Sequence, residues 1–416
     1  MRNFFTGRLL FVRVCLLVSV LLLLLVGLLT IYAVGNPLDP SPAVEVEEEI
    51  VELAGLWKKQ LVFIVFALCG FVAANVVDYR RLGRASYGIY AIVLALLAYL
   101  VVSRYVGRLP FAAPSHNAHR WIAFHSSLPR IQPSEFCKLA YILALAWYLR
   151  YRSNYRNLKS LVGPFALTLL PMVLILVEPD LGTTLLMMPI FFTMLFIAGA
   201  RVKHLLLIML AALLISPMMY LELRGYQRLR ISSVLLQSPW VRHKAEQSPR
   251  IAKLLVDDKF TERAWQNDWG YHLIRSKFAV ASGGLTGLGF GRGPFIKYGF
   301  LSERHNDFIF AVVAHQWGFL GSLAFLGLYV IMVLCGLEIA ANNIDPFARL
   351  VALGIVAMFA VQVLVNVGMT LGIMPITGLT LPFVSYGGSS LLVNMMAIGL
   401  LNNIGRCRPF SVAPRK

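Results

Sequence analysis

Long runs without a charged residue constrain this chain more than any other feature of its sequence. A helix that crosses the hydrocarbon core of a bilayer needs about 20 consecutive, mostly apolar residues. Seven runs without Asp, Glu, Lys or Arg approach or exceed that length: Val14–Leu38, Gln60–Val77, Ala85–Ser103, Ser160–Val177, Leu181–Ala200, Leu205–Leu221 and Phe308–Leu337. We therefore expect several spanning helices. The first run should be a retained helix, because its apolar stretch is longer than that of a cleaved signal peptide.

Three further spans complete the predicted architecture. The run Leu350–Gly405 has no charge over 56 residues, which is enough for two helices, and the segment GIMPITGLTLPF divides it. The segment Ser134–Leu149 is apolar except for Glu135 and Lys138. Only 14% of the residues are charged, against about 25% in soluble domains. The chain is therefore predicted to be one all-α polytopic membrane domain over residues 1–416, with about ten transmembrane helices.

Lys and Arg residues in the short loops predict which way the chain faces. If the N-terminus is cytoplasmic, the inner segments hold 17 basic residues and the short outer loops hold 6. Both termini are therefore expected in the cytoplasm. The long polar stretch 222–306 then becomes a large extracytoplasmic loop between the seventh and eighth helices, and we expect it to be partly helical.

The net charge of +18 fits a membrane protein, because basic residues at the inner surface are attracted to anionic lipids. Membrane lipids are thus expected partners. Nucleic acid is not, since no basic stripe interleaved with aromatic residues occurs outside the apolar runs. The five cysteines have neither metal-ligand spacing nor the pattern of a disulfide framework.

Few ionisable residues lie in the predicted membrane region, and each is a candidate for function because charge at that depth is costly. In QPSEFCK, Glu135 and Lys138 lie three residues apart, so they can pair on one helix face. Alternatively, Lys138 can meet an anionic lipid head in a cavity. In EPDLGTT, Asp180 can cap the next helix, and Glu178 is expected at the rim of the same turn.

Two glycine-rich segments interrupt the apolar pattern. SGGLTGLGFGRG carries six glycines from Gly283 to Gly293 and no P-loop lysine pattern, so a nucleotide site is not expected. We expect a re-entrant loop that is buried in protein or lines a wet cavity. PITGLTLPFVSYGGSS, which includes Ser385, Gly387 and Gly388, predicts a broken helix between two spans.

Asp307 stands immediately before the uncharged run that starts at Phe308. A carboxylate partly withdrawn from water at the outer boundary binds a proton more readily, which suits a general base. Capping of the following helix is the alternative, and both roles can hold at once.

Five stretches resemble the SEDS family (shape, elongation, division and sporulation) of the RodA and FtsW type. They are RWIAF…RIQPSEFCKLA, EPDLGTT, YHLIRSKFAVASGGLTGLGFG, HNDFIFAVVAHQWGFLG and NVGMTLGIMPITGLTLPFVSYGGSSLLVNMMAIGLLNNI. The resemblance, from about Lys59 to Arg408, implies ten spans in the bacterial cytoplasmic membrane. It also implies peptidoglycan glycosyltransferase activity in cell elongation or division. Such an enzyme polymerises lipid II at the outer face, inverting C1 to form β-1,4 bonds. The implied protein partner is a class B penicillin-binding protein, which crosslinks the strands.

The resemblance also assigns residues. Asp307 matches the essential acidic residue of the family motif H-x-D-F-I-F and is the expected catalytic residue. Lys138, Glu135 and Asp180 match family residues that line the same cavity, and we expect them to bind substrate. Further expected substrate-binding residues of this chain are Arg120, Arg130, Ser385, Gly387 and Gly388. A pyrophosphate leaving group needs cationic stabilisation, from these basic residues, from Arg292 or from a divalent cation. Where the family usually has two glutamates after FIFA, this chain has His315 and Gln316.

Two other functions stay open from the sequence. A lipid II flippase would also have ten spans, broken helices and central polar groups. It needs polar groups through the membrane thickness, however, whereas the acidic residues here cluster on the predicted outer side. A non-catalytic scaffold of the cell-wall machinery predicts that Asp307 can be replaced without loss.

Overall fold

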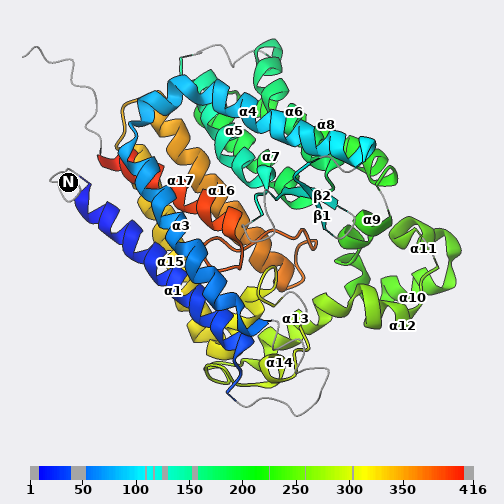
Figure 1. Ribbon diagram of the computed structural model, residues 1–416. Helices are drawn as coiled ribbons and strands as arrows, with labels where there is room; N and C mark the ends of the chain where they lie inside the picture. Colours follow the sequence, from blue (N-terminus) through cyan, green and yellow to red (C-terminus); the bar gives the residue numbers. More distant parts are fainter. Residues whose placement is uncertain are drawn as a thin grey trace, which may run out of the picture.

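The computed structural model describes residues 9–38, 53–107, 110–115, 118–123, 130–151, 158–223, 225–257, 259–301 and 304–406. The acidic part of the first predicted outer loop, residues 39–52, lies outside the described residues. The described residues fold into a bundle of long helices with a group of short helices at one end (Figure 1).

Long apolar helices make up most of the structure. Each of the seven uncharged runs and the segment Ser134–Leu149 lies largely on one of them, and the run Leu350–Gly405 spans two. In chain order they are α1 (Leu10–Gly35), α3 (Leu56–Val76), α4 (Tyr79–Val106), α5 (Pro133–Leu149), α6 (Val162–Val177), α7 (Leu181–Ile197), α8 (Val202–Leu221), α15 (Ile309–Ala341), α16 (Pro346–Thr370) and α17 (Gly388–Arg406). The non-helical residues 371–387 separate α16 from α17, as predicted. Of the helices in the described chain, α1, α3, α4, α15 and α16 are long and apolar enough to cross a membrane, and α6, α7 and α8 are shorter apolar helices.

Helix α5 lies inside the bundle, where it contacts α4, α6, α7, α16 and α17 (Figure 1). Fourteen of its 17 residues are buried, so it is enclosed on nearly all sides. Helix α3 runs along α17, and α1 runs along α15. Because α5 carries Glu135 and Lys138, this arrangement places both charged residues in the protein interior.

Helix α15 is interrupted at Gly318, whose φ of 63° and ψ of −162° are accessible mainly to glycine. The interruption leaves backbone groups of α15 without partners in the helix, and the glycine-rich loop binds them. The amide of Leu288 donates to the carbonyl of His315 at 3.1 Å, and the amide of Phe319 donates to the carbonyl of Gly284 at 2.8 Å. The loop is thus held against protein backbone on one side, whereas Leu285 and Leu288 are exposed, and its re-entry into the membrane stays a prediction.

Short helices build the segment 222–306, as predicted for a partly helical loop. They are α9 (Gly225–Ser232), α10 (Pro239–Gln247), α11 (Pro249–Val256), α12 (Glu262–Ala264), α13 (Tyr271–Ser282) and α14 (Pro294–Lys297). A small apolar core that includes Leu236, Phe260 and Trp265 holds much of this segment together. The segment is fastened to the end of α16, where Ser276 Oγ donates to the carbonyl of Thr370 at 2.8 Å.

A short β-hairpin, which was not predicted, adds to the all-α architecture. Strands β1 (Ala112–Ser115) and β2 (Ala118–Ile122) pair antiparallel in the connection between α4 and α5, with Ala112 opposite Ile122. The strands have four and five residues, which is too short to leave a clear alternating pattern in the sequence.

Candidate active site

Hydrogen bonds join the motif around Asp307 to the motif PITGLTLPFVSYGGSS. Ser385 Oγ donates to the carbonyl of Asn306 at 2.8 Å and accepts from the amide of Leu381 at 2.8 Å. Asn366 Nδ2 donates to the carbonyl of Asp307 at 2.9 Å. Two successive carbonyl groups before α15 are therefore fixed by side chains from the far end of the sequence.

Asp307 is partly buried and lies just before the start of α15. The helix begins at Ile309, and its N-cap residue is Phe308. Asp307 therefore stands one residue before the position from which side chains usually cap a helix. Capping of α15 and the role of general base both stay predictions for this carboxylate.

Arg230 of α9 shares the surroundings of Asp307. A Cβ atom built on Gly378 would lie 3.5 Å from Asp307 Oδ2 and 3.9 Å from Arg230 Nη1. Gly378 has a φ of 75°, which disfavours any side chain there. The carboxylate and the guanidinium thus border the same space above a glycine backbone. Arg230 was not among the predicted residues, because it lies in a basic stretch without a recognisable motif and approaches Asp307 only through the fold.

The predicted pairing of Glu135 with Lys138 is confirmed. Lys138 Nζ lies 2.6 Å from Glu135 Oε2, and both residues are buried, Lys138 completely. Each charge compensates the other in the protein interior, so removal of one alone would leave a buried, uncompensated charge. Contact of Lys138 with a ligand stays a prediction.

Asp180 caps α7, as predicted for one of its two roles. Its Oδ1 accepts from the amide of Thr183 at 3.1 Å, and its Oδ2 accepts from the hydroxyl groups of Thr183 and Ser134 at 2.9 and 3.0 Å. Gln132 Nε2 approaches the same Oδ2 at 3.4 Å. The carboxylate therefore fastens the start of α7 to the start of α5, and its contact with substrate stays a prediction.

The prediction that Glu178 lies at the rim of its turn is wrong, because this residue is buried. Only 2% of its surface is exposed, and neither carboxylate oxygen has a hydrogen-bond partner among the described residues. Burial and the nearby charge of Asp180 raise the pKa of Glu178 to about 9, against a smaller opposing effect of Arg120. The carboxyl group is therefore protonated at neutral pH.

The unpredicted hairpin explains this burial. Arg120 of β2 donates from Nε to the carbonyl of Glu178 at 2.7 Å, and from Nη2 to the carbonyl of Pro179. The hairpin thereby covers the turn between α6 and α7. Arg120 was predicted to bind substrate, and its guanidinium binds this turn.

The remaining predicted residues lie where α17 begins. The side chain of Arg130 is exposed, and its carbonyl accepts from Ser389 Oγ at 3.2 Å. Gly387 precedes α17 and Gly388 opens it. A Cβ atom on Gly388 would lie 3.1 Å from the ring of Phe63, so glycine lets α17 begin close against α3.

A protein ligand set for a metal ion does not occur in the described part of the chain, where no three His, Cys, Asp or Glu side chains gather closely enough. The described residues therefore offer no cluster of ligands for the divalent cation that was considered from the sequence. Arg230 is a cationic group of the described chain that borders the same space as the Asp307 carboxylate.

The sequence matches a known protein family along almost its whole length. Residues 13–408 match the model of the FtsW/RodA/SpoVE family, described as cell cycle proteins. The chain is 34% identical to peptidoglycan glycosyltransferase RodA of Treponema pallidum (strain Nichols), over 92% of this chain and 96% of that protein. It is 32% identical to stage V sporulation protein E of Bacillus subtilis (strain 168), over 94% and 96%. It is 33% identical to peptidoglycan glycosyltransferase MrdB of Escherichia coli (strain K12), over 78% and 84%.

Solved structures share the fold. A chain from a peptidoglycan synthase complex that coordinates polymerization and crosslinking matches with a TM-score of 0.70 and 28% identity, over 94% of this chain and 96% of that one. The rod shape determining protein RodA of Thermus thermophilus matches with a TM-score of 0.62 and 26% identity, over 94% and 95%. The helical architecture is therefore RodA-like over 94% of this chain.

Proposed function

The chain belongs to the FtsW/RodA/SpoVE family of SEDS peptidoglycan glycosyltransferases, and we propose that it polymerises lipid II with Asp307 as the general base. The observation that carries this proposal is the position of the Asp307 carboxylate beside Arg230, above the backbone of Gly378. A carboxylate can accept a proton there, and a guanidinium can hold negative charge. Both are needed when a hydroxyl group displaces a phosphate-linked leaving group.

In the proposed reaction, the 4-hydroxyl of the acceptor sugar attacks C1 of the donor strand. The new O–C1 bond forms while the bond from C1 to the lipid pyrophosphate breaks, and the pyrophosphate leaves with the bonding electrons. Asp307 accepts the hydroxyl proton. Attack opposite the leaving group inverts C1 and gives a β-1,4 bond. A base in this role must reach the hydroxyl within about 2.6–3.2 Å, directly or through one water.

The other residues take supporting roles in this proposal. Arg230 is the first candidate to stabilise the pyrophosphate, because it borders the same space as Asp307. Lys138 contributes charge as half of a pair with Glu135, so its field at a ligand is partly compensated. Ser385 positions the backbone next to Asp307, whereas Asp180 holds together the starts of α5 and α7.

We further propose ten spans, with both termini in the cytoplasm, segment 222–306 outside, and the bacterial cytoplasmic membrane as the location. The count of 17 basic residues inside against 6 outside supports this orientation. In a variant without the five native cysteines, Ser248→Cys should react with an impermeant thiol reagent in intact cells, and Tyr151→Cys should not. Equal reaction at both positions would contradict the orientation.

A class B penicillin-binding protein is the proposed partner. The match to a chain of a synthase complex that coordinates polymerization and crosslinking supports it, because that fold works beside a crosslinking activity. The purified chain, with and without such a partner, should convert fluorescent lipid II into a ladder of glycan strands on a gel. Transfer of lipid II across a liposome bilayer without strand formation would overturn polymerisation and favour a flippase.

A further inference from the structure

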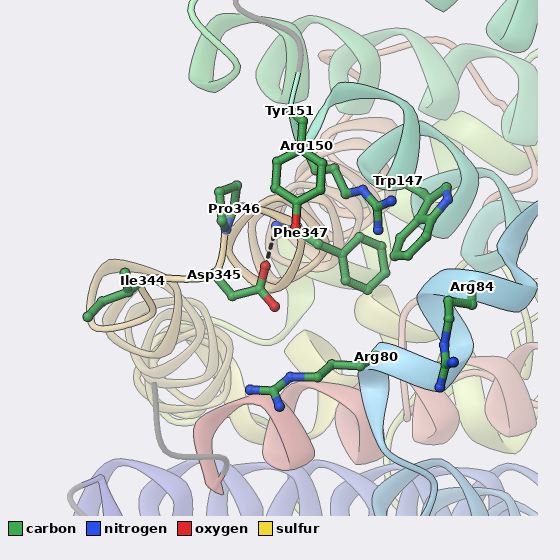
Figure 2. A pocket seen from close by; sticks show the side chains of 9 residues that line it. All are labelled: Arg80, Arg84, Trp147, Arg150, Tyr151, Ile344, Asp345, Pro346 and Phe347. Atoms are coloured by element: carbon green, nitrogen blue, oxygen red, sulfur yellow. Dashed lines mark hydrogen bonds between the residues drawn. The ribbon is translucent and has the colours of Figure 1, made fainter. Parts of the chain in front are cut away.

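A pocket of about 620 Å³ lies at the opposite end of α16 from Asp307 (Figure 2). Asp345 and Phe347 line it at the start of α16, whereas Asn366, which binds the Asp307 carbonyl, lies near the end of that helix. At about 1.5 Å per residue, the two places are roughly 30 Å apart along α16. The pocket is therefore separate from the candidate active site.

Aromatic rings form one wall of this pocket. Phe347 stacks on Tyr79 with ring centroids 6.4 Å apart and meets the edge of Trp147 at 5.3 Å. Tyr79 and Phe347 are each 2% exposed. A Cβ atom on Gly83 would lie 2.6 Å from the Trp147 ring, so the absence of a side chain lets α4 press against the aromatic cluster. The wall is apolar and fixed by packing.

Arginine side chains surround this aromatic wall. Arg80 and Arg84 reach the pocket from α4, and Arg150 reaches it from the end of α5 (Figure 2). Asp345 is the single acidic residue among the described residues that line the pocket, so these residues carry three positive charges and one negative charge, a net +2. Asp345 Oδ1 already accepts from the amide of Phe347 at 3.0 Å, where it caps α16.

Two of these arginines keep their charge uncompensated. Neither Arg84 nor Arg150 forms an ion pair with a carboxylate of any residue that the structure describes. The guanidinium of Arg150 lies over the ring of Trp147 and 4.7 Å from the ring centroid of Tyr151. Such stacking orients a guanidinium without neutralising it, which leaves its N–H groups available for an anion.

We propose that this pocket binds the phosphate group of an anionic phospholipid. A planar guanidinium matches the geometry of phosphate, and basic pockets between the inner ends of spanning helices are suited to anionic head groups. Trp147 and Tyr151 have the amphipathic side chains found at the membrane–water boundary, and the apolar wall can take the glycerol and upper acyl carbons. The assignment to the inner leaflet rests on the proposed orientation. The proposal that the pocket binds lipid does not depend on the proposed polymerase activity.

Native mass spectrometry of the full chain in detergent tests this proposal. The parent protein, offered phosphatidylglycerol and phosphatidylcholine with identical acyl chains, should retain phosphatidylglycerol preferentially. Arg84→Gln with Arg150→Gln should lower this retention by about fivefold for each arginine, hence roughly 25-fold together. Arg150→Lys, which keeps the charge and loses the planar stack, should fall between the parent and the double variant.

A matched double variant controls for general surface charge. Arg201→Gln with Lys203→Gln removes two exposed positive charges at the start of α8, outside the pocket, and should retain phosphatidylglycerol like the parent. Equal loss in both double variants, or no loss in the pocket variant, would overturn the proposal. If the double pocket variant does not fold, Arg84→Gln alone is measured, and it should lower the retention of phosphatidylglycerol by about fivefold.

Soluble competitors separate a lipid from a free anion. Inorganic phosphate and glycerol 3-phosphate at millimolar concentration should leave the retained phosphatidylglycerol in place. Complete displacement by either would identify a site for soluble phosphate and would overturn the assignment to lipid.

Discussion

Asn366 joins the backbone of Asp307 to the segment that carries Gly378. Its Nδ2 donates to the carbonyl of Asp307 at 2.9 Å and to the carbonyl of Leu379 at 2.7 Å. Asn366 is completely buried in α16, so water cannot replace it. One amide group therefore sets the position of the candidate base relative to the glycine that borders the site.

Replacement of Asn366 by Ala should slow catalysis more than it weakens substrate binding. Loss of both hydrogen bonds leaves two carbonyls without a donor, which costs about 1–3 kcal/mol of stability for a buried group. We expect kcat for lipid II polymerisation to fall while KM changes little. Asn402→Ala is the control, because Asn402 is equally buried and donates at 3.0 Å to Asn75, at the far end of the bundle. A parent-like kcat for Asn366→Ala would exclude a positioning role.

Lys138→Met should reduce polymerisation, and the response to a second change shows why. If Lys138 acts only as the partner of Glu135, addition of Glu135→Gln removes the uncompensated buried charge and should restore stability and activity together. If Lys138 also meets the pyrophosphate, as predicted from the sequence, the double variant should regain its melting temperature and stay slow. Recovery of both quantities in the double variant would remove Lys138 from substrate binding.

Glu178 should make the protein less stable as pH rises. Its pKa, raised by burial from 4.5 to about 9, means that the folded state keeps a proton which the unfolded state releases. The free energy of unfolding therefore falls across the interval from pH 4.5 to about pH 9.

Glu178→Gln removes this effect. At about 1.4 kcal/mol per pKa unit, the variant should be more stable than the parent by at least about 2 kcal/mol near pH 8, and the advantage should shrink towards pH 5. Thermal melting across this range gives the measurement. Glu246→Gln, at an exposed position, should stay within about 0.5 kcal/mol of the parent. An advantage of Glu178→Gln that does not depend on pH would contradict the protonated state.

Gly318→Ala should destabilise the protein because two features forbid a side chain there. The backbone conformation costs about 1–3 kcal/mol for other residues, and the new Cβ would lie 2.7 Å from the carbonyl of Leu285. Gly327 lies in the same helix with no atom within 4 Å of its Cβ position. Gly327→Ala should therefore be neutral or stabilising by up to about 1 kcal/mol. Equal melting temperatures for the two variants would contradict the conclusion that the interruption of α15 at Gly318 requires glycine.

The sequence predicted those features that depend on nearby residues or on the bilayer itself. The apolar runs had to become helices because a membrane excludes unpaired backbone groups. The pairing of Glu135 with Lys138 follows from their spacing on one helix face, and the capping of α7 by Asp180 follows from the residues directly after it.

Features that depend on distant contacts could not be predicted in this way. Glu178 is buried because the short hairpin covers its turn through Arg120. Arg230 comes near Asp307 only because α9 folds back over Gly378. No local pattern in the sequence encodes either contact.

The rate of lipid II polymerisation by Asp307→Asn tests the central claim most directly. Asn keeps the size of Asp and cannot accept the hydroxyl proton, so the folded variant should lose about 10²–10⁴-fold in rate. Asp257→Asn makes the same change in the segment 222–306, where Asp257 forms a surface pair with Arg228 at 3.2 Å, and should polymerise like the parent. An Asp307→Asn protein that melts like the parent and polymerises lipid II at the parent rate would remove Asp307 from catalysis.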